Sequence, residues 1–216
     1  MKTAIIVLSI MAIALAVPGL AFDGERKGFI LGGGIGPAFT SFHEEGKYEF
    51  CSPYGEYETD HSGIGLQYSV RAGYAPIDRL AFYAFGKDIS FEYKGAVHHG
   101  DVELFEDSQI YTTGFLGFGT MYFHKTAYPS FYTKGEVAYP VTNSSFIQPD
   151  FSFSKGGPPG FSFCFGLGYE FARNWCAELD ATWAETSGGY WSGYGSHLTY
   201  ETSSYSIALT VNAFVY

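Results

Sequence analysis

The sequence has little charge, few cysteines and, after its first 21 residues, no long apolar run. No later stretch holds 18 consecutive apolar residues, which excludes a further transmembrane helix. Lys and Arg number 12 against 22 acidic residues, and the net charge of −10 argues against a nucleic-acid partner, because phosphate binding needs clustered basic side chains. Cys51, Cys164 and Cys176 are too few for a disulfide scaffold, so we expect them to be unpaired packing residues.

The first 21 residues have the pattern of a secretory signal. Lys2 supplies a positive start, an apolar run extends from Ala4 to Val17, and small residues end the segment. A retained anchor helix is the weaker alternative, because the apolar run is shorter than the ~20 residues that a membrane span needs. We therefore expect residues 1–21 to direct export and residues 22–216 to form one domain.

Aromatic residues and glycines are abundant instead. Aromatics make up 19% of the chain, which is too many for a disordered protein, and glycines number 28. Apolar residues recur at every second position over segments of about ten residues, the period of a β-strand. The pattern predicts eight strands, at 28–42, 63–75, 80–93, 108–123, 131–141, 160–171, 175–185 and 200–216. In the third and fourth of these the alternation is blurred, so the pattern does not assign their faces.

The connections between the expected strands alternate in length. Short turns join the second strand to the third, the fourth to the fifth and the sixth to the seventh. Longer polar stretches join the others, near 43–62, 94–107, 142–159 and 186–199. Short turns on one side and long loops on the other predict an all-β fold, an eight-stranded antiparallel up-and-down barrel.

The polar face of these strands indicates which side of the barrel is wet. A soluble barrel turns its apolar face inward, whereas a transmembrane barrel turns it toward lipid. The polar face is rich in glycine, which a solvated face would not need but which makes room for long side chains in a narrow lumen. Charges of both signs can pair there, where an unpaired charge is costly. We predict a lumen network of Arg71, Lys134, Glu136, Glu170, Glu178 and Asp180. Glu170 is expected to pair with Arg71 or Lys134.

The tryptophans also favour a transmembrane barrel. Trp175 and Trp183 share one face, eight residues apart, which corresponds to ~20 Å along the axis of a tilted strand. Tyr74, Tyr169 and Phe171 flank short turns in the same way. These five residues are the predicted aromatic girdle at the membrane edges.

The chain as a whole resembles small bacterial outer-membrane β-barrels of the OmpA membrane-domain and OmpX type. The features that carry the resemblance are the export signal, the eight strands, GYEFARNW at a hairpin, and a last strand, SIALTVNAFVY, that ends on an aromatic residue. The resemblance implies location in the outer membrane, contact with its lipids and lipopolysaccharide, and delivery by the barrel-assembly machinery through the last strand. Phe214 fits the family's alternation counted back from the end, whereas Asn212 and Thr210 depart from it.

The expected role is structural or interactive, because eight strands leave an interior that side chains fill. One alternative is an enzyme that modifies lipid A. Ser196 and His197 suggest it, but the deacylase pattern wants His-x-Ser-Asn, and here Thr199 and Tyr200 follow His197. A second alternative is a barrel that binds a small ligand in its mouth. We expect no catalytic residue and no cofactor.

Two polar stretches are candidates for cation binding. Residues 98–107 contain His98, His99, Asp101 and Glu103, but neighbouring histidines on an extended chain point apart, which favours a solvated loop over a metal site. The acidic, tyrosine-rich stretch 43–62 could contact other molecules at the cell surface, or bridge to lipopolysaccharide phosphates through divalent cations. The simpler interpretation is again a solvated loop.

Overall fold

A computed structural model describes residues 26–49, 56–99, 102–145, 160–191 and 197–216 of the chain. These residues form eight strands, and among them no helix is long and apolar enough to cross a membrane. The strands are β1 (Gly28–Glu49), β2 (Glu56–Ile77), β3 (Leu80–His99), β4 (Val102–Phe123), β5 (Ser130–Ser145), β6 (Gly160–Ala172), β7 (Trp175–Trp191) and β8 (His197–Val215).

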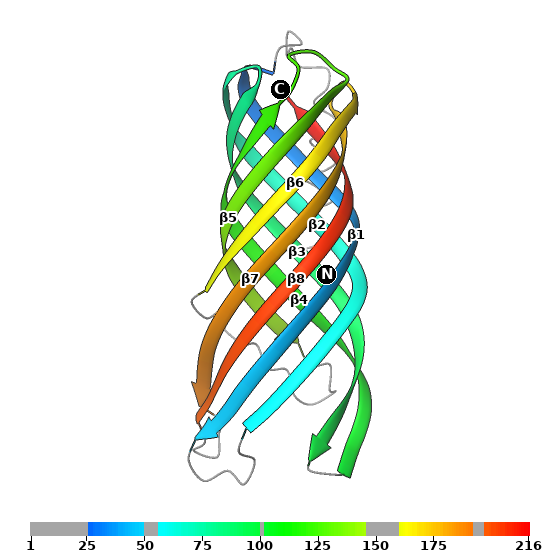
Figure 1. Cartoon of the computed structure of the whole chain (residues 1–216), viewed down its shortest axis with the longest axis vertical. Coiled ribbons are helices and arrows are strands. Elements are labelled where there is room, and N and C mark those ends of the chain that lie inside the picture. Colours follow the sequence, from blue (N-terminus) through cyan, green and yellow to red (C-terminus); the bar gives the residue numbers. More distant parts are fainter. Residues whose placement is uncertain (1–25, 50–55, 100–101, 146–159, 192–196) are drawn as a thin grey trace.

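Each strand pairs antiparallel with the next, and β8 pairs with β1 to close the barrel (Figure 1). Following the pairing once around the barrel from Ile30 returns to β1 at Thr40, ten residues further along. On eight strands such a shift tilts the strands by about 40° from the barrel axis. The predicted up-and-down barrel is confirmed, with its three short turns at one end, called here the turn end.

The strands are longer than the sequence pattern predicts. All eight lie where expected, but β1 and β2 extend through much of 43–62, and β3 and β4 extend through most of 94–107. Pairing continues there as far as Lys47 and Glu56. The pattern missed the extensions of β1 and β2 because these residues are mostly polar on both faces, so the alternation of apolar and polar residues fades while the pairing continues.

Over the part nearer the turn end, the outward face of every strand is mostly apolar. In β6 burial alternates without a break, with its aromatic residues outside and its small or charged residues inside. The same alternation assigns β3, in which Phe82 faces out and Tyr83 and Lys87 face in. Such a continuous exposed apolar surface is far larger than the patches found on soluble proteins.

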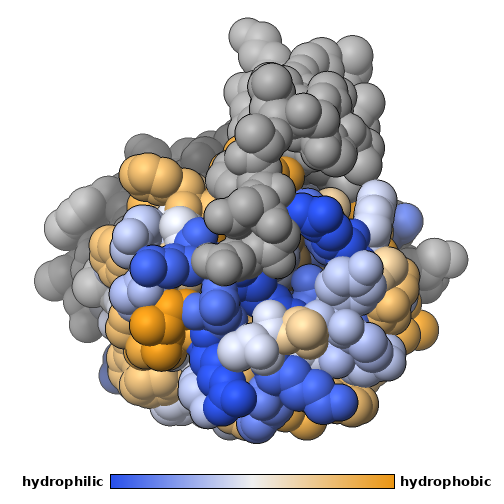
Figure 2. Space-filling view, turned by 90° about the horizontal axis from the view of Figure 1, so that it is seen from above, coloured by the Kyte–Doolittle hydropathy of each residue, from blue (hydrophilic) through white to orange (hydrophobic). Residues whose placement is uncertain are grey.

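Large outward aromatic residues gather in two rings. Near the turn end these are Phe29, Tyr74, Phe82, Tyr122, Phe131, Tyr169, Phe171 and Trp175. Further along the strands are Phe39, Tyr139, Phe161, Phe163, Trp183 and Tyr205. Figure 2, which views the turn end, has hydrophobic residues on the circumference and hydrophilic residues at the centre. The arrangement is that of an apolar band between two aromatic girdles.

The inward direction of the even-numbered residues accounts for the departure of the last strand from the family's alternation. Thr210, Asn212 and Phe214 all face inward, as does Tyr216 at the end of the chain. From Tyr205 to Val211 the odd-numbered residues are the exposed ones. The final aromatic residues of this chain therefore help to fill the lumen at the turn end.

Candidate functional site

The middle of the lumen holds a buried network of ion pairs. Arg71 donates two hydrogen bonds to the Glu178 carboxylate, at 2.6 and 2.7 Å. The Lys134 ammonium lies 2.7 Å from Glu178 and 2.8 Å from Asp180. β2, β5 and β7 thus converge on one cluster inside the barrel.

A second part of the network surrounds Glu136. Lys87 lies 3.0 Å from this carboxylate and Lys134 lies 3.4 Å from it. The Tyr83 hydroxyl donates a hydrogen bond to it at 2.9 Å. The sequence pattern did not identify Lys87 because the faces of β3 were unassigned. A lysine midway between the apolar residues Phe85 and Ile89, in a strand that pairs with the Arg71-bearing β2, was the available signal.

The charges of this network balance. Its cations are Arg71, Lys87 and Lys134, and its anions are Glu136, Glu178 and Asp180, all of them at most 3% exposed. An ion pair in a low-dielectric interior contributes little net stability, but removing one partner strands a buried charge at a cost of about 3–5 kcal/mol. The network therefore holds the barrel in one arrangement and fills its centre.

Glycines on neighbouring strands make room for the long side chains. A Cβ at Gly166 would collide with the side chains of Asp180 and Lys134, and a Cβ at Gly168 would collide with the Tyr132 ring. A larger residue at either position would displace part of the packed interior. The glycine-rich inner face thus follows from the size of the side chains opposite it.

Arg26 forms a separate buried ion pair at the turn end, and this pair corrects one prediction. Its guanidinium pairs with Glu170, donates to the Lys125 carbonyl oxygen at 2.6 Å and lies 4.3 Å from the centre of the Phe123 ring. The prediction that Glu170 pairs with Arg71 or Lys134 is therefore wrong. Glu170 sits near the turn end of β6, whereas those two cations are engaged by the carboxylates of β5 and β7.

Aromatic rings complete the closure at this end. Phe123 packs against Tyr132 at 5.1 Å and against Tyr216 at 6.1 Å between ring centres, and Phe214 stacks on Tyr216 at 5.9 Å. The buried cysteines Cys164 and Cys176 are not bonded, in line with the sequence expectation. Cys51 lies outside the described residues.

Toward the other end the inner face is aromatic. Phe42, Phe91 and Tyr111 form a buried cluster in which Phe42 stacks on Tyr111 at 4.3 Å between ring centres. These inward apolar residues were not foreseen, because two of them lie on β3 and β4. They pack on one another and fill this part of the interior, as the ion pairs fill the part nearer the turn end.

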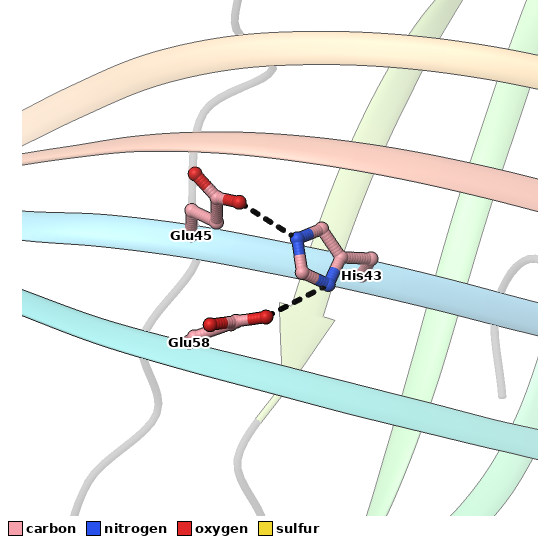
Figure 3. Close-up of side chains that lie close together, drawn as sticks. All are labelled: His43, Glu45 and Glu58. Carbon is pink, nitrogen blue, oxygen red and sulfur yellow. Dashed lines mark hydrogen bonds and ion pairs between the residues drawn. The ribbon is translucent and has the colours of Figure 1, made fainter.

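An outward cluster of titratable residues lies on β1 and β2 beyond the aromatic girdle (Figure 3). His43 contacts Asp60 at 2.8 Å and Glu45 at 3.0 Å, and Glu58 lies 4.0 Å away. The hydrogen bonds to Glu45 and Asp60 raise the pKa of His43 to about 9. Ligand atoms of His43, Glu45 and Glu58 lie within 4.8 Å of one another, a spacing that a metal ion could use. The protonated ring itself supplies positive charge to this acidic group.

The remaining predicted residues fall into two groups. Tyr74, Tyr169, Phe171 and Trp175 are exposed on the outside in the turn-end ring, and Trp183 lies in the other ring, stacked on Phe163. Of the candidate metal ligands near 98–107, Asp101 lies outside the described residues, as does Ser196. The structure does not describe the side chains of the others, His98, His99 and Glu103, or of His197. Of that group Thr199 is described, and its hydroxyl contacts the Lys47 carbonyl oxygen at 3.5 Å.

Comparison with known proteins shows a likeness of structure. No protein-family model and no curated protein matches the sequence. Among solved structures, OprG from Pseudomonas aeruginosa matches with a TM-score of 0.56 and 11% identity, over 91% of this chain and 100% of that chain. Neisserial surface protein A matches with a TM-score of 0.43 and 13% identity, over 82% and 96% of the two chains. Ail of Yersinia pestis, in complex with the heparin analogue sucrose octasulfate, matches with a TM-score of 0.35 and 12% identity, over 82% and 98%. The protein has the fold of an eight-stranded outer-membrane β-barrel.

Proposed function

We propose that the protein is a non-enzymatic outer-membrane barrel that has a structural and surface-interaction role and passes no bulk solute. The observation that supports this most is the combination of an apolar outer band with a filled, charge-balanced interior. The band suits lipid on all sides, and the network leaves the lumen without an open aqueous path.

The membrane location draws further support from the fold likeness to OprG and from the export pattern in residues 1–21. The proposed lipid partners are those of the outer membrane, including lipopolysaccharide. Delivery would use the barrel-assembly machinery, which would recognise the last strand. The proposed orientation puts the short turns in the periplasm and the long hairpins outside the cell.

The length of the strands supports a role beyond the membrane. A tilted strand crosses a bilayer with about 9–11 residues, whereas β3 has 20 and β1 has 22. The hairpins therefore continue past the girdle as paired strands. Within 43–62, 94–107, 142–159 and 186–199, the ends of these strands and the connections between them would form a surface for contact with other molecules.

The argument against lipid-A chemistry is the pattern at His197, where threonine and tyrosine replace the serine and asparagine of the deacylase pattern. A mass spectrum of lipid A from cells with and without the gene tests this directly. We expect identical spectra. A deacylated or acylated species that disappears with the gene would show that the barrel is an enzyme.

Two measurements test the proposed function itself. After expression with its natural leader, the protein should fractionate with the outer membrane and resist extraction by alkaline carbonate. Reconstituted into a planar bilayer, it should produce no stepwise conductance. A protein that is released by carbonate would contradict the membrane location, and regular conductance steps would contradict the closed lumen.

A further inference from the structure

A histidine and three carboxylates meet on the outer face of β1 and β2, at the end of the barrel opposite the turn end. His43 lies across from Asp60 in the register, and Glu45 lies across from Glu58. The two residues on each strand are two positions apart, so all four share one face, because side chains alternate along a strand. We call His43, Glu45, Glu58 and Asp60 the His43 cluster.

The His43 cluster begins one residue pair beyond the second aromatic ring. Ser41 pairs with Tyr205 of that ring, and His43 pairs with Ser203, the next residue on the same face of β8. The side chain of His43 is 35% exposed, and those of the three carboxylates are 67% to 76% exposed. The cluster therefore lies past the apolar band and is open to solutes in water.

The distances within the cluster suit a metal ion. Nε2 of His43 lies 3.0 Å from Oε1 of Glu45, and one ligand atom from each of His43, Glu45 and Glu58 lies within 4.8 Å of the other two (Figure 3). Two ligand atoms of a tetrahedral zinc ion, each about 2.0–2.1 Å from the metal, are about 3.3 Å apart. The pair of His43 and Glu45 is already close to that spacing, and the exposed side chain of Glu58 needs to move by only about 1.5 Å.

Asp60 is placed to orient the imidazole. Its Oδ1 atom lies 2.8 Å from Nδ1 of His43, so this carboxylate can accept the Nδ1–H bond. A histidine that binds a metal usually donates its other ring N–H to a carboxylate, carbonyl or water, which fixes the tautomer and the direction of the ring. With Nδ1–H donated to Asp60, Nε2 is the nitrogen that faces Glu45 and is available to a metal ion.

Carboxylates outnumber cations among the described residues of this face. Glu201 of β8, also exposed, lies opposite Glu45, and Lys47, the next cation along β1, lies opposite a further acid, Glu56. A divalent cation would reduce this excess of negative charge. The imidazole decides the class of cation, because Mg²⁺ and Ca²⁺ prefer oxygen ligands alone, whereas zinc and its neighbours also take imidazole nitrogen.

We propose that the His43 cluster binds a divalent transition-metal ion of the zinc type. Nε2 of His43 and the carboxylates of Glu45 and Glu58 are its ligands, water takes the fourth position, and Asp60 is a positioning residue. The ion competes with the ring proton of His43, because only a neutral imidazole binds a metal. Once bound, it joins β1 to β2 where their pairing has left the apolar band.

Isothermal titration calorimetry of the purified barrel, without an affinity tag and in detergent micelles, tests the site with ZnCl₂ and CaCl₂. We expect zinc to bind at least about 100-fold more tightly than calcium, which gains nothing from the imidazole. His43→Gln and Glu45→Gln should each weaken zinc binding by at least about tenfold. Circular dichroism checks that each variant keeps its β-structure, so that lost binding reports on the site itself.

Glu185→Gln is the matched control, because it removes the same charge from an exposed carboxylate on the same outer surface. Glu185 pairs with Ser203, which pairs with His43, so it lies two strand spacings, or roughly 10 Å, from the imidazole. This variant should leave zinc affinity unchanged. An equal loss in Glu185→Gln and Glu45→Gln would show diffuse attraction to an acidic surface and no site.

Two further readouts separate ligation from charge. Zinc affinity should rise severalfold from pH 6 to pH 8 as His43 loses its proton, and this rise should be absent in His43→Gln, because the carboxylates are ionised throughout that range. Asp60→Ala should weaken zinc binding about tenfold, and Asp60→Asn, which keeps an oxygen that accepts the Nδ1–H bond, should recover part of the loss. Equal losses in Asp60→Ala and Asp60→Asn would contradict the positioning role.

Three results would overturn the proposal. These are an unchanged zinc affinity in His43→Gln, calcium that binds as tightly as zinc, and a loss of the zinc site in the double variant His98→Gln with His99→Gln, which would place the ion near 98–107. The titration is made in micelles and does not depend on the proposed membrane location. Its failure would therefore refute the metal site alone.

Discussion

Arg26 and Glu170 form a buried ion pair between residues 144 positions apart in the sequence. The pair joins the residue just before β1 to the end of β6, and it lies over the aromatic residues that close the turn end. This pair is separate from the central network. Glu170 at the turn end therefore has a cation beside it, as the carboxylates in the middle of the lumen do.

Arg26→Ala should lower the free energy of unfolding by about 3–5 kcal/mol, because Glu170 would remain buried without its cation. Urea titration of the protein in lipid vesicles measures this change. Arg79→Ala, which removes an exposed arginine from the β2–β3 turn, is the control and should change stability by less than about 0.5 kcal/mol. Equal effects of the two variants would contradict the buried pair.

Lys87→Met should destabilise the barrel by about 3 kcal/mol, because it leaves the central network with one uncompensated negative charge. The double variant Lys87→Met with Glu136→Gln restores the balance and should recover at least half of the loss in the same titration. Lys125→Met removes an exposed lysine and should have almost no effect. If the double variant is less stable than Lys87→Met, the two residues are not coupled.

Replacement by valine should destabilise the barrel at one glycine and be tolerated at another. Gly168→Val places a side chain against the buried Tyr132 ring, and the overpacking should cost about 1–3 kcal/mol or block insertion into vesicles. Gly135→Val points outward, where an added Cβ meets nothing within 4 Å, and should be tolerated. Comparable loss in both variants would argue against the assigned faces of β5 and β6.

The His43 cluster should respond to pH above neutrality. Because the pKa of His43 is raised from 6.5 to about 9, the charged contacts are complete below about 6.5 and are lost as pH rises through about 9. An NMR titration of the imidazole resonances measures this, and Glu45→Gln should move the midpoint down. His61, whose pKa burial lowers, is an internal reference that should titrate below 6.5. A midpoint of His43 near 6.5 would contradict the cluster.

The sequence alone assigned inward and outward residues where one face of a strand is apolar and the other is not. In β6 and β7 the alternation is clean, so inward residues such as Glu178 and Asp180 could be named in advance. In β3 it fails, because Tyr83, Phe85 and Ile89 face inward while Asp88 faces out. Apolar residues then lie on both faces, and only the register with β2 and β4 assigns them.

Two other features depend on contacts that no local pattern contains. Arg26 precedes the first strand, so nothing in its surroundings indicates that it enters the lumen; its partner Glu170 is known only once the barrel closes. The strand extensions past Phe42 are mostly polar on both faces, so no alternation marks them, although the pairing of β1 with β2 continues. Registers and distant partners therefore had to come from the structure.

The central claim is that one face of every strand meets lipid while the other faces a filled lumen. Spin labels placed one at a time at residues 161–169 of β6, in the reconstituted protein, test it most directly by their collision rates with oxygen and with a water-soluble nickel complex. Labels at Phe163, Phe165 and Leu167 should be accessible to oxygen in lipid and closed to nickel, and labels at Ser162 and Cys164 should be closed to both. Access of nickel at the aromatic positions, or the absence of a two-residue period, would contradict the account.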